Sequence, residues 1–150
     1  MTEFGAVGPG YSINDPEVAA MSTVVGSRSA YFVAESMDSD PRLVGGAGVM
    51  PLRDGDESTC ELIKMYLLPA ARGHGLGQRL LSRCLEAARG FGFTRCYLET
   101  LESMSRAQEL YRRNGFVARC APLGQTGHSS CNCWMDRSLE PDPDRRSLPR

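Results

Sequence analysis

The pattern of hydrophobic and polar positions is clearest between residues 76 and 88, where it follows the repeat of an α-helix. The hydrophobic positions that share one face are Leu76, Leu80, Leu81, Cys84, Leu85 and Ala88. The other face is mostly polar, with Gln78, Arg79, Ser82, Arg83 and Glu86. An apolar stripe of this period predicts an amphipathic helix packed on a core. Gly90 and Gly92 then predict its end.

Two further helices are predicted. The segment 105–116 ("SRAQELYRRNGF") has Ser105 and Gln108 in the spacing of a capping box, and it ends at Asn114-Gly115 as a helix commonly does. The segment 15–25 ("DPEVAAMSTVV") reads as a short helix, with an aspartate at the N-cap and a proline at the first helical position.

The remaining hydrophobic segments are short, rich in β-branched and aromatic residues and separated by turns, which predicts strands. They are residues 30–36, 42–52, 60–69, 94–100 and 131–139. The resulting order is helix, three strands, helix, strand, helix, and one or two strands, which predicts a mixed α/β domain over residues 1–139. Residues 140–150 ("EPDPDRRSLPR") are polar and proline-rich, a composition typical of disorder.

Composition narrows the functional class. A chain of 150 residues suits one domain, and its 41% hydrophobic and 23% charged residues are typical of a soluble globular protein. A net charge of −1 gives no general basic field for nucleic acid or an anionic membrane. No segment has the length of a membrane span, and the first residues lack the pattern of a signal peptide, so we expect a cytoplasmic protein.

The cysteine content leaves two interpretations open. The six cysteines could pair as disulfides, but reduced thiols are favoured because no export signal is present. Cys131-x-Cys133 could suggest a metal hook, yet zinc sites use a wider spacing and a second ligand pair. Ordinary packing on one face of a strand is therefore favoured, and we predict no metal site.

The stretch "LPAARGHGLGQRLL" (68–81) places glycines between a predicted strand and a predicted helix. Backbone N–H groups at a helix N-terminus bind anions, and diphosphate is their usual occupant; the alternative is a tight turn without a ligand. Walker A is excluded because Gln78-Arg79 follows Gly77. The dinucleotide fingerprint is excluded because Gln78 or Leu80 stands where its third glycine belongs.

The pattern Arg72-x-x-Gly75-x-Gly77 resembles the acetyl-CoA signature of the GNAT superfamily of N-acetyltransferases. The segment 97–116 ("YLETLESMSRAQELYRRNGF") is similar to that family's next strand and helix, and 127–139 ("GHSSCNCWMDRSL") to the closing strand of some small members. The resemblance covers about residues 29–139. It implies the GNAT mixed α/β fold and the transfer of acetyl from acetyl-CoA to a primary amine.

The resemblance also implies how acetyl-CoA is held. Backbone N–H groups from Arg72 to Gly77 would bind the pyrophosphate, through a run that comprises Arg72, Gly73, His74, Gly75, Leu76 and Gly77. The main chain of Met65 and Leu67 would bond the pantetheine arm as if it were an added strand. The side chains of Arg72, His74 and Arg79 would add positive charge near the phosphates.

Two catalytic residues follow from the same resemblance. Tyr111 occupies the position of the family's tyrosine that protonates the leaving sulfur; the alternative is a packing role on the buried face of its helix. Glu61 occupies the position of the general base in the histone-acetylating branch, and alternation predicts that it shares a face with Met65 and Leu67. The alternatives for Glu61 are a strand-edge carboxylate or a site that uses a water relay instead.

Glu99 is a candidate either for a second base or for binding the acceptor ammonium, and His128 is a candidate for binding the acceptor. The sequence does not identify the acceptor beyond a small amine, an amino acid or a peptide. Two departures from the family pattern stand out. Met104 occupies the place of an asparagine that contacts the cofactor in many members. The family's first strand and helix look absent or shortened, so either the chain starts downstream of the true start or a partner covers that sheet edge, as a homodimer would.

Two other functions remain as alternatives. A non-catalytic CoA-binding regulatory module would keep the glycine loop without turnover. A binder of nucleotide phosphates would use the same helix N-terminus without CoA, although the failed Walker and dinucleotide patterns disfavour it.

Overall fold

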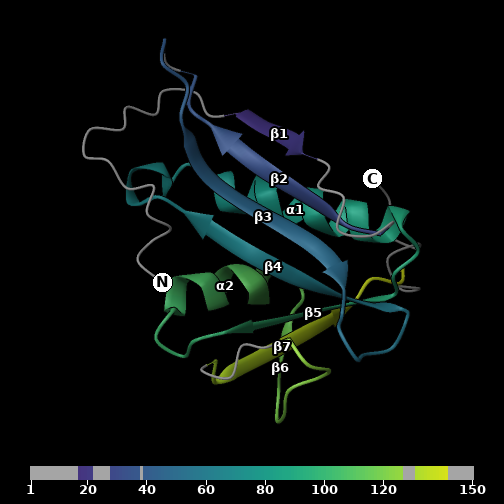
Figure 1. Cartoon of the computed structure of the whole chain (residues 1–150). Coiled ribbons are helices and arrows are strands. Elements are labelled where there is room, and N and C mark those ends of the chain that lie inside the picture. Colours follow the sequence, from purple (N-terminus) through teal and green to yellow (C-terminus); the bar gives the residue numbers. More distant parts are fainter. Residues whose placement is uncertain (1–16, 22–27, 38, 127–130, 142–150) are drawn as a thin grey trace, which may run out of the picture.

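The computed structural model describes residues 17–21, 28–37, 39–126 and 131–141 (Figure 1). Seven strands form one sheet in the order β1-β2-β3-β4-β5-β7-β6. The strands are β1 Glu17–Met21, β2 Ala30–Glu35, β3 Leu43–Pro51, β4 Thr59–Leu67, β5 Arg95–Thr100, β6 Val117–Arg119 and β7 Cys133–Ser138. The helices are η2 Pro69–Ala71, α1 Leu76–Gly90 and α2 Ser105–Arg113. Every strand pair is antiparallel except β4 with β5, which confirms the mixed α/β prediction.

Helix α1 packs against one face of β2, β3 and β4 and runs behind them in Figure 1. The hydrophobic stripe read from the sequence is the buried face of this helix: Leu76, Leu80, Leu81, Cys84, Leu85 and Ala88. Each fully buried leucine contributes about 2 kcal/mol of transfer free energy, so the stripe fixes α1 on the sheet. The helix ends as predicted, with Gly92 at a φ of +89° just beyond it.

The prediction of a helix over residues 15–25 is wrong in the part that the structure describes. Residues 17–21 form β1, which pairs antiparallel with β2 from Glu17↔Glu35 to Met21↔Tyr31. Without β1, β2 would be an edge strand with a row of unpaired N–H and C=O groups, which an extended segment satisfies and a helix cannot. The sheet therefore has a first strand at this edge, where the sequence predicts one that is absent or shortened.

Helix α2 is confirmed, but its predicted capping box is not formed. Met104 is the N-cap and Ser105 is already the first helical residue, without a side-chain cap bond. The side-chain amide of Gln108 instead donates to the carbonyls of Leu101 (2.8 Å) and Glu102 (3.1 Å) and so holds the turn between β5 and α2.

All six cysteines are free thiols, three of them buried in the core: Cys60, Cys84 and Cys96. Among the described residues, no helix is long and apolar enough to cross a membrane.

Candidate functional site

The loop between η2 and α1 owes its shape to two glycines. Gly73 has a φ of +84° and Gly75 a φ of +74°, and a Cβ on either would meet nothing within 4 Å. These positions therefore need glycine for the left-handed backbone rather than for space. Gly77 differs, because a Cβ there would lie 3.3 Å from Leu110 and 3.4 Å from Leu67. Its small size lets the first turn of α1 approach α2 and β4.

The same loop presents a run of backbone N–H groups. The Arg72 N–H donates to the Pro69 carbonyl and the Arg79 N–H to the Gly75 carbonyl, each at 3.2 Å. Between these two bonds, the N–H groups of residues 73–78 donate to no other described residue. They lie at the positive end of the α1 dipole, which favours an anion there.

Strands β4 and β5 separate along the part of β4 that lies next to this loop. They pair only from Thr59–Glu61 on β4 to Arg95–Tyr97 on β5, and their remaining lengths diverge (Figure 1). A β-bulge accompanies the divergence, since Gly46↔Tyr66 and Gly48↔Ile63 set two residue steps on β3 against three on β4. The extra residue bends β4 locally, as bulges do.

The bulge reverses which side chains of β4 face α1. Cys60 and Leu62 belong to the core under α1, and so Glu61 points to the opposite face. Beyond the bulge, Met65 and Leu67 pack against that same core and reach the first turn of α1. The prediction that Glu61 shares a face with Met65 and Leu67 is therefore wrong.

On the face away from α1, two carboxylates lie near each other. Glu61 is 5% exposed, and burial first, then the charge of Glu99, raises its pKa from 4.5 to about 7. Glu99 accepts hydrogen bonds from the Tyr97 hydroxyl at 2.6 Å and from the Thr126 hydroxyl. The Tyr97 oxygen in turn accepts the Leu123 N–H at 3.0 Å, so Glu99 is firmly oriented.

Cys131 belongs to the same group, because burial and then the charges of Glu99 and Glu61 raise its pKa. We call these residues the carboxylate cluster: Glu61, Tyr97, Glu99, Thr126 and Cys131.

Tyr111 lies on the other face of the sheet. It is 7% exposed, belongs to the core under α1, and packs edge-on against Phe116 with ring centroids 5.8 Å apart. Burial, followed by the nearby thiols of Cys84 and Cys96, raises its pKa to about 12. Its hydroxyl forms no hydrogen bond with any residue that the structure describes.

Comparison with known proteins identifies the family. A model of the acetyltransferase (GNAT) family matches residues 10–116. The uncharacterized N-acetyltransferase YjgM of Escherichia coli is 41% identical over 131 residues, which span 87% of this chain and 77% of that protein. The chain belongs to the GNAT acetyltransferase family.

Solved structures agree with the fold of this acetyltransferase. A GNAT-family acetyltransferase from Staphylococcus aureus Mu50 has a TM-score of 0.66 at 23% identity, covering 75% of this chain and 69% of that one. The protein yncA of Salmonella typhimurium, solved with its cofactor acetyl-CoA, has a TM-score of 0.60 at 24% identity, covering 81% and 69%.

Most residues that the sequence assigned to cofactor binding in this acetyltransferase gather around the loop of residues 72–77. His74 is exposed there and Leu76 is buried. The Arg72 side chain lies along the loop, with its Nε donating to the Leu67 carbonyl at 3.1 Å. Arg79 lines a shallow depression on α1 with Gln78, Ser82 and Arg83. His128, predicted to bind the acceptor, lies outside the described residues.

Sequence reasoning missed three members of the carboxylate cluster. Tyr97 had a usable signal, because it stands two residues before Glu99 on one strand and so shares its face. Thr126 comes from a segment without regular structure, and Cys131 precedes β7. Neither of these two has a periodic pattern that would place it beside the carboxylates.

Proposed function

We propose that this acetyltransferase moves the acetyl group of acetyl-CoA onto a primary amine, which attacks the thioester directly while both substrates are bound. The observation that carries the proposal is the run of N–H groups at residues 73–78, next to the part of β4 around Met65 and Leu67 that does not pair with β5. The pyrophosphate of CoA fits the amides, and a thioester arm extending from it would run along the part of β4 that does not pair with β5.

Within this proposal the cofactor lies along β4. The N–H groups from Gly73 to Gly77 hold the pyrophosphate, whereas the Arg72 N–H, which the sequence also assigned to this role, donates to the Pro69 carbonyl. The main chain of Met65 and Leu67 pairs with the pantetheine arm. Arg72 braces the end of β4 through its bond to the Leu67 carbonyl. The guanidinium groups of Arg72 and Arg79 add positive charge, and the exposed imidazole of His74 lies on the same loop.

The chemistry is divided between the two faces of the sheet. Glu61, with a pKa of about 7, takes a proton from the acceptor ammonium on the face away from α1. The amine then forms the N–C bond, and the main chain near Leu67 faces the oxyanion. Tyr111 gives its proton to the sulfur as the C–S bond breaks, and the extra proton on the newly bonded nitrogen then restores the neutral phenol. The Tyr111 hydroxyl is not committed to another described residue.

Glu99 is the proposed contact for the positive charge of the acceptor. Tyr97 and Thr126 fix its two oxygens, so it lies ready beside Glu61 without a change of rotamer. His128, which lies outside the described residues, stays a predicted contact for the acceptor.

Calorimetric titration of the purified chain with acetyl-CoA, with ATP as the control, tests the cofactor assignment. Binding of acetyl-CoA without binding of ATP supports it, whereas a folded chain that binds neither contradicts it. A panel of primary amines, followed by release of the CoA thiol, then tests the transfer. Cofactor binding without turnover of any amine would favour a non-catalytic CoA-binding module.

A further inference from the structure

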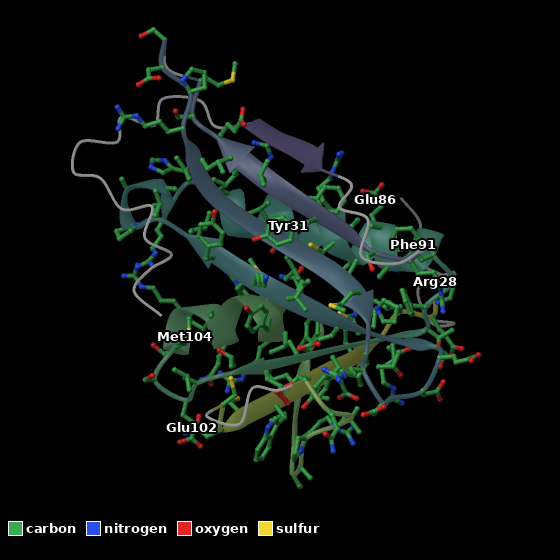
Figure 2. All side chains as sticks on the ribbon, viewed as in Figure 1. Arg28, Tyr31, Glu86, Phe91, Glu102 and Met104 are labelled. Atoms are coloured by element: carbon green, nitrogen blue, oxygen red, sulfur yellow. The ribbon has the colours of Figure 1, made fainter. Side chains whose placement is uncertain are left out.

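Tyr31, on β2, reaches across two neighbouring strands. On β3, a Cβ at Gly46 would lie 2.7 Å from the Tyr31 hydroxyl oxygen, and a Cβ at Gly48 would lie 2.5 Å from the ring. Only glycine at these positions leaves room for the tyrosine to lie flat. The hydroxyl then donates to the Lys64 carbonyl on β4 at 3.0 Å. Figure 2 shows Tyr31 on the near face of the sheet, with α1 running behind.

Lys64 is part of the three-residue step of the β4 bulge, between Ile63 and Tyr66. Its φ is +47°, a left-handed conformation that costs a residue with a side chain roughly 1 kcal/mol or more. Such a conformation persists only where surrounding contacts hold it. Within the described part of the chain, the Tyr31 hydroxyl is the side-chain donor that the structure shows for the carbonyl of this residue.

We propose that Tyr31 is a positioning residue for acetyl transfer, because its bond to the Lys64 carbonyl holds the bulge that turns Met65 and Leu67 toward α1. Tyr31 acts through β4 and has no contact with the reacting atoms. The inference rests on the proposed function, which places the pantetheine arm along Met65 and Leu67. Gly46 and Gly48 serve the same purpose, since they make room for the ring.

The first test compares two ligands on Tyr31→Phe and on the unaltered chain. CoA carries the pantetheine arm, whereas adenosine 3′,5′-bisphosphate has only phosphates and adenosine. Loss of the hydrogen bond from the Tyr31 hydroxyl to the Lys64 carbonyl should weaken CoA binding about 3- to 10-fold. Binding of the bisphosphate, followed by NMR titration at millimolar concentration, should stay unchanged, because the loop of residues 73–78 does not depend on Tyr31.

If Tyr31 only stabilised the fold, Tyr31→Phe would lower the melting temperature and would weaken the binding of both ligands or of neither ligand. Either binding result overturns the proposal. The two proposals also fail differently. If the unaltered chain does not bind CoA, the proposed function is contradicted. If the unaltered chain binds CoA and the Tyr31→Phe variant binds it equally well, only the proposed role of Tyr31 is contradicted.

A second variant disrupts the bond between the Tyr31 hydroxyl and the Lys64 carbonyl without changing either residue. The methyl of Gly46→Ala would displace the Tyr31 hydroxyl, whereas that of Gly90→Ala meets nothing within 4 Å and is the matched control. Gly46→Ala should weaken CoA binding as Tyr31→Phe does, and Gly90→Ala should not. In the double variant the two losses should fall short of their sum, because one bond cannot be broken twice. Fully additive losses would overturn the proposal.

Discussion

Glu61 and Tyr111 lie on opposite faces of the central sheet. Glu61 alternates with Cys60, whose side chain lies in the core under α1, and Tyr111 belongs to that core. Both lie close to the last β4–β5 pair, since Glu61 is the register partner of Tyr97 and the Cys96 thiol contributes to the raised pKa of Tyr111. A thioester lying along β4 where it has separated from β5 would therefore meet the proposed acid, Tyr111, on one side and the proposed base, Glu61, on the other.

The rate of acetyl transfer should rise with pH up to about 7 and then level off, because the proposed base Glu61 has a pKa of about 7. Glu61→Gln should lower the rate by about a hundredfold or more and remove this dependence. Glu99→Gln should move the midpoint to lower pH, since the Glu99 charge is the second cause of the raised pKa. The measurement is kcat/KM against pH; an unchanged midpoint in Glu99→Gln would argue against Glu61 as the titrating group.

The same carboxyl predicts a pH dependence of stability. The folded chain keeps the Glu61 proton up to about pH 7, whereas the unfolded chain releases it near 4.5. The folded state thus binds more protons in this window, and the contribution of Glu61 to the free energy of unfolding falls as pH rises from 4.5 to 7. Glu61→Gln should remove that slope in urea unfolding curves taken across the window. An identical slope in both proteins would contradict the buried, protonated carboxyl.

Tyr111→Phe should lower kcat by about a hundredfold while the affinity for acetyl-CoA and the melting temperature stay nearly constant. The phenol ring keeps its contact with Phe116, and the hydroxyl bonds no described residue, so its loss leaves no buried partner unsatisfied. Steady-state kinetics and calorimetry on the same preparation separate the two effects. If binding collapses along with turnover, Tyr111 is a packing residue.

Residue content and turn signals predicted most strands, helix-end signals predicted α2, and periodicity predicted α1 because that helix has one buried face. These signals missed the bulge in β4, since Lys64 is an ordinary residue in a left-handed conformation and nothing in "CELIKMYL" marks it. For the same reason the face of the sheet on which Glu61 lies was predicted wrongly, because that prediction assumed unbroken alternation along β4. β1 was misread for a different reason, because pairing with β2 overrides a local pattern that reads as helical.

Substitution of the left-handed glycines in the loop should destabilise the protein through backbone strain and not through steric crowding. Gly75→Ala puts a methyl in open space but at a φ of +74°, which should destabilise the fold by about 1 kcal/mol and weaken acetyl-CoA binding. Gly75→Asn should be milder in both respects, because asparagine tolerates this conformation best after glycine. Urea unfolding and calorimetry check the order Gly, Asn, Ala. An asparagine variant that is less stable and binds more weakly than the alanine variant would show that side-chain bulk matters instead.

The bulge residue offers the opposite test, because there a non-glycine residue occupies left-handed backbone. Lys64→Gly should raise the free energy of unfolding by about 1 kcal/mol relative to Lys64→Ala, which loses the same charge but keeps the Cβ at a φ of +47°. Lys64→Val should be the least stable of the three, since a branched Cβ fits this conformation worst. Urea unfolding of the three variants gives the comparison. A glycine variant no more stable than the alanine variant would mean that Lys64 bears no strain, and the bulge would then need no support from Tyr31.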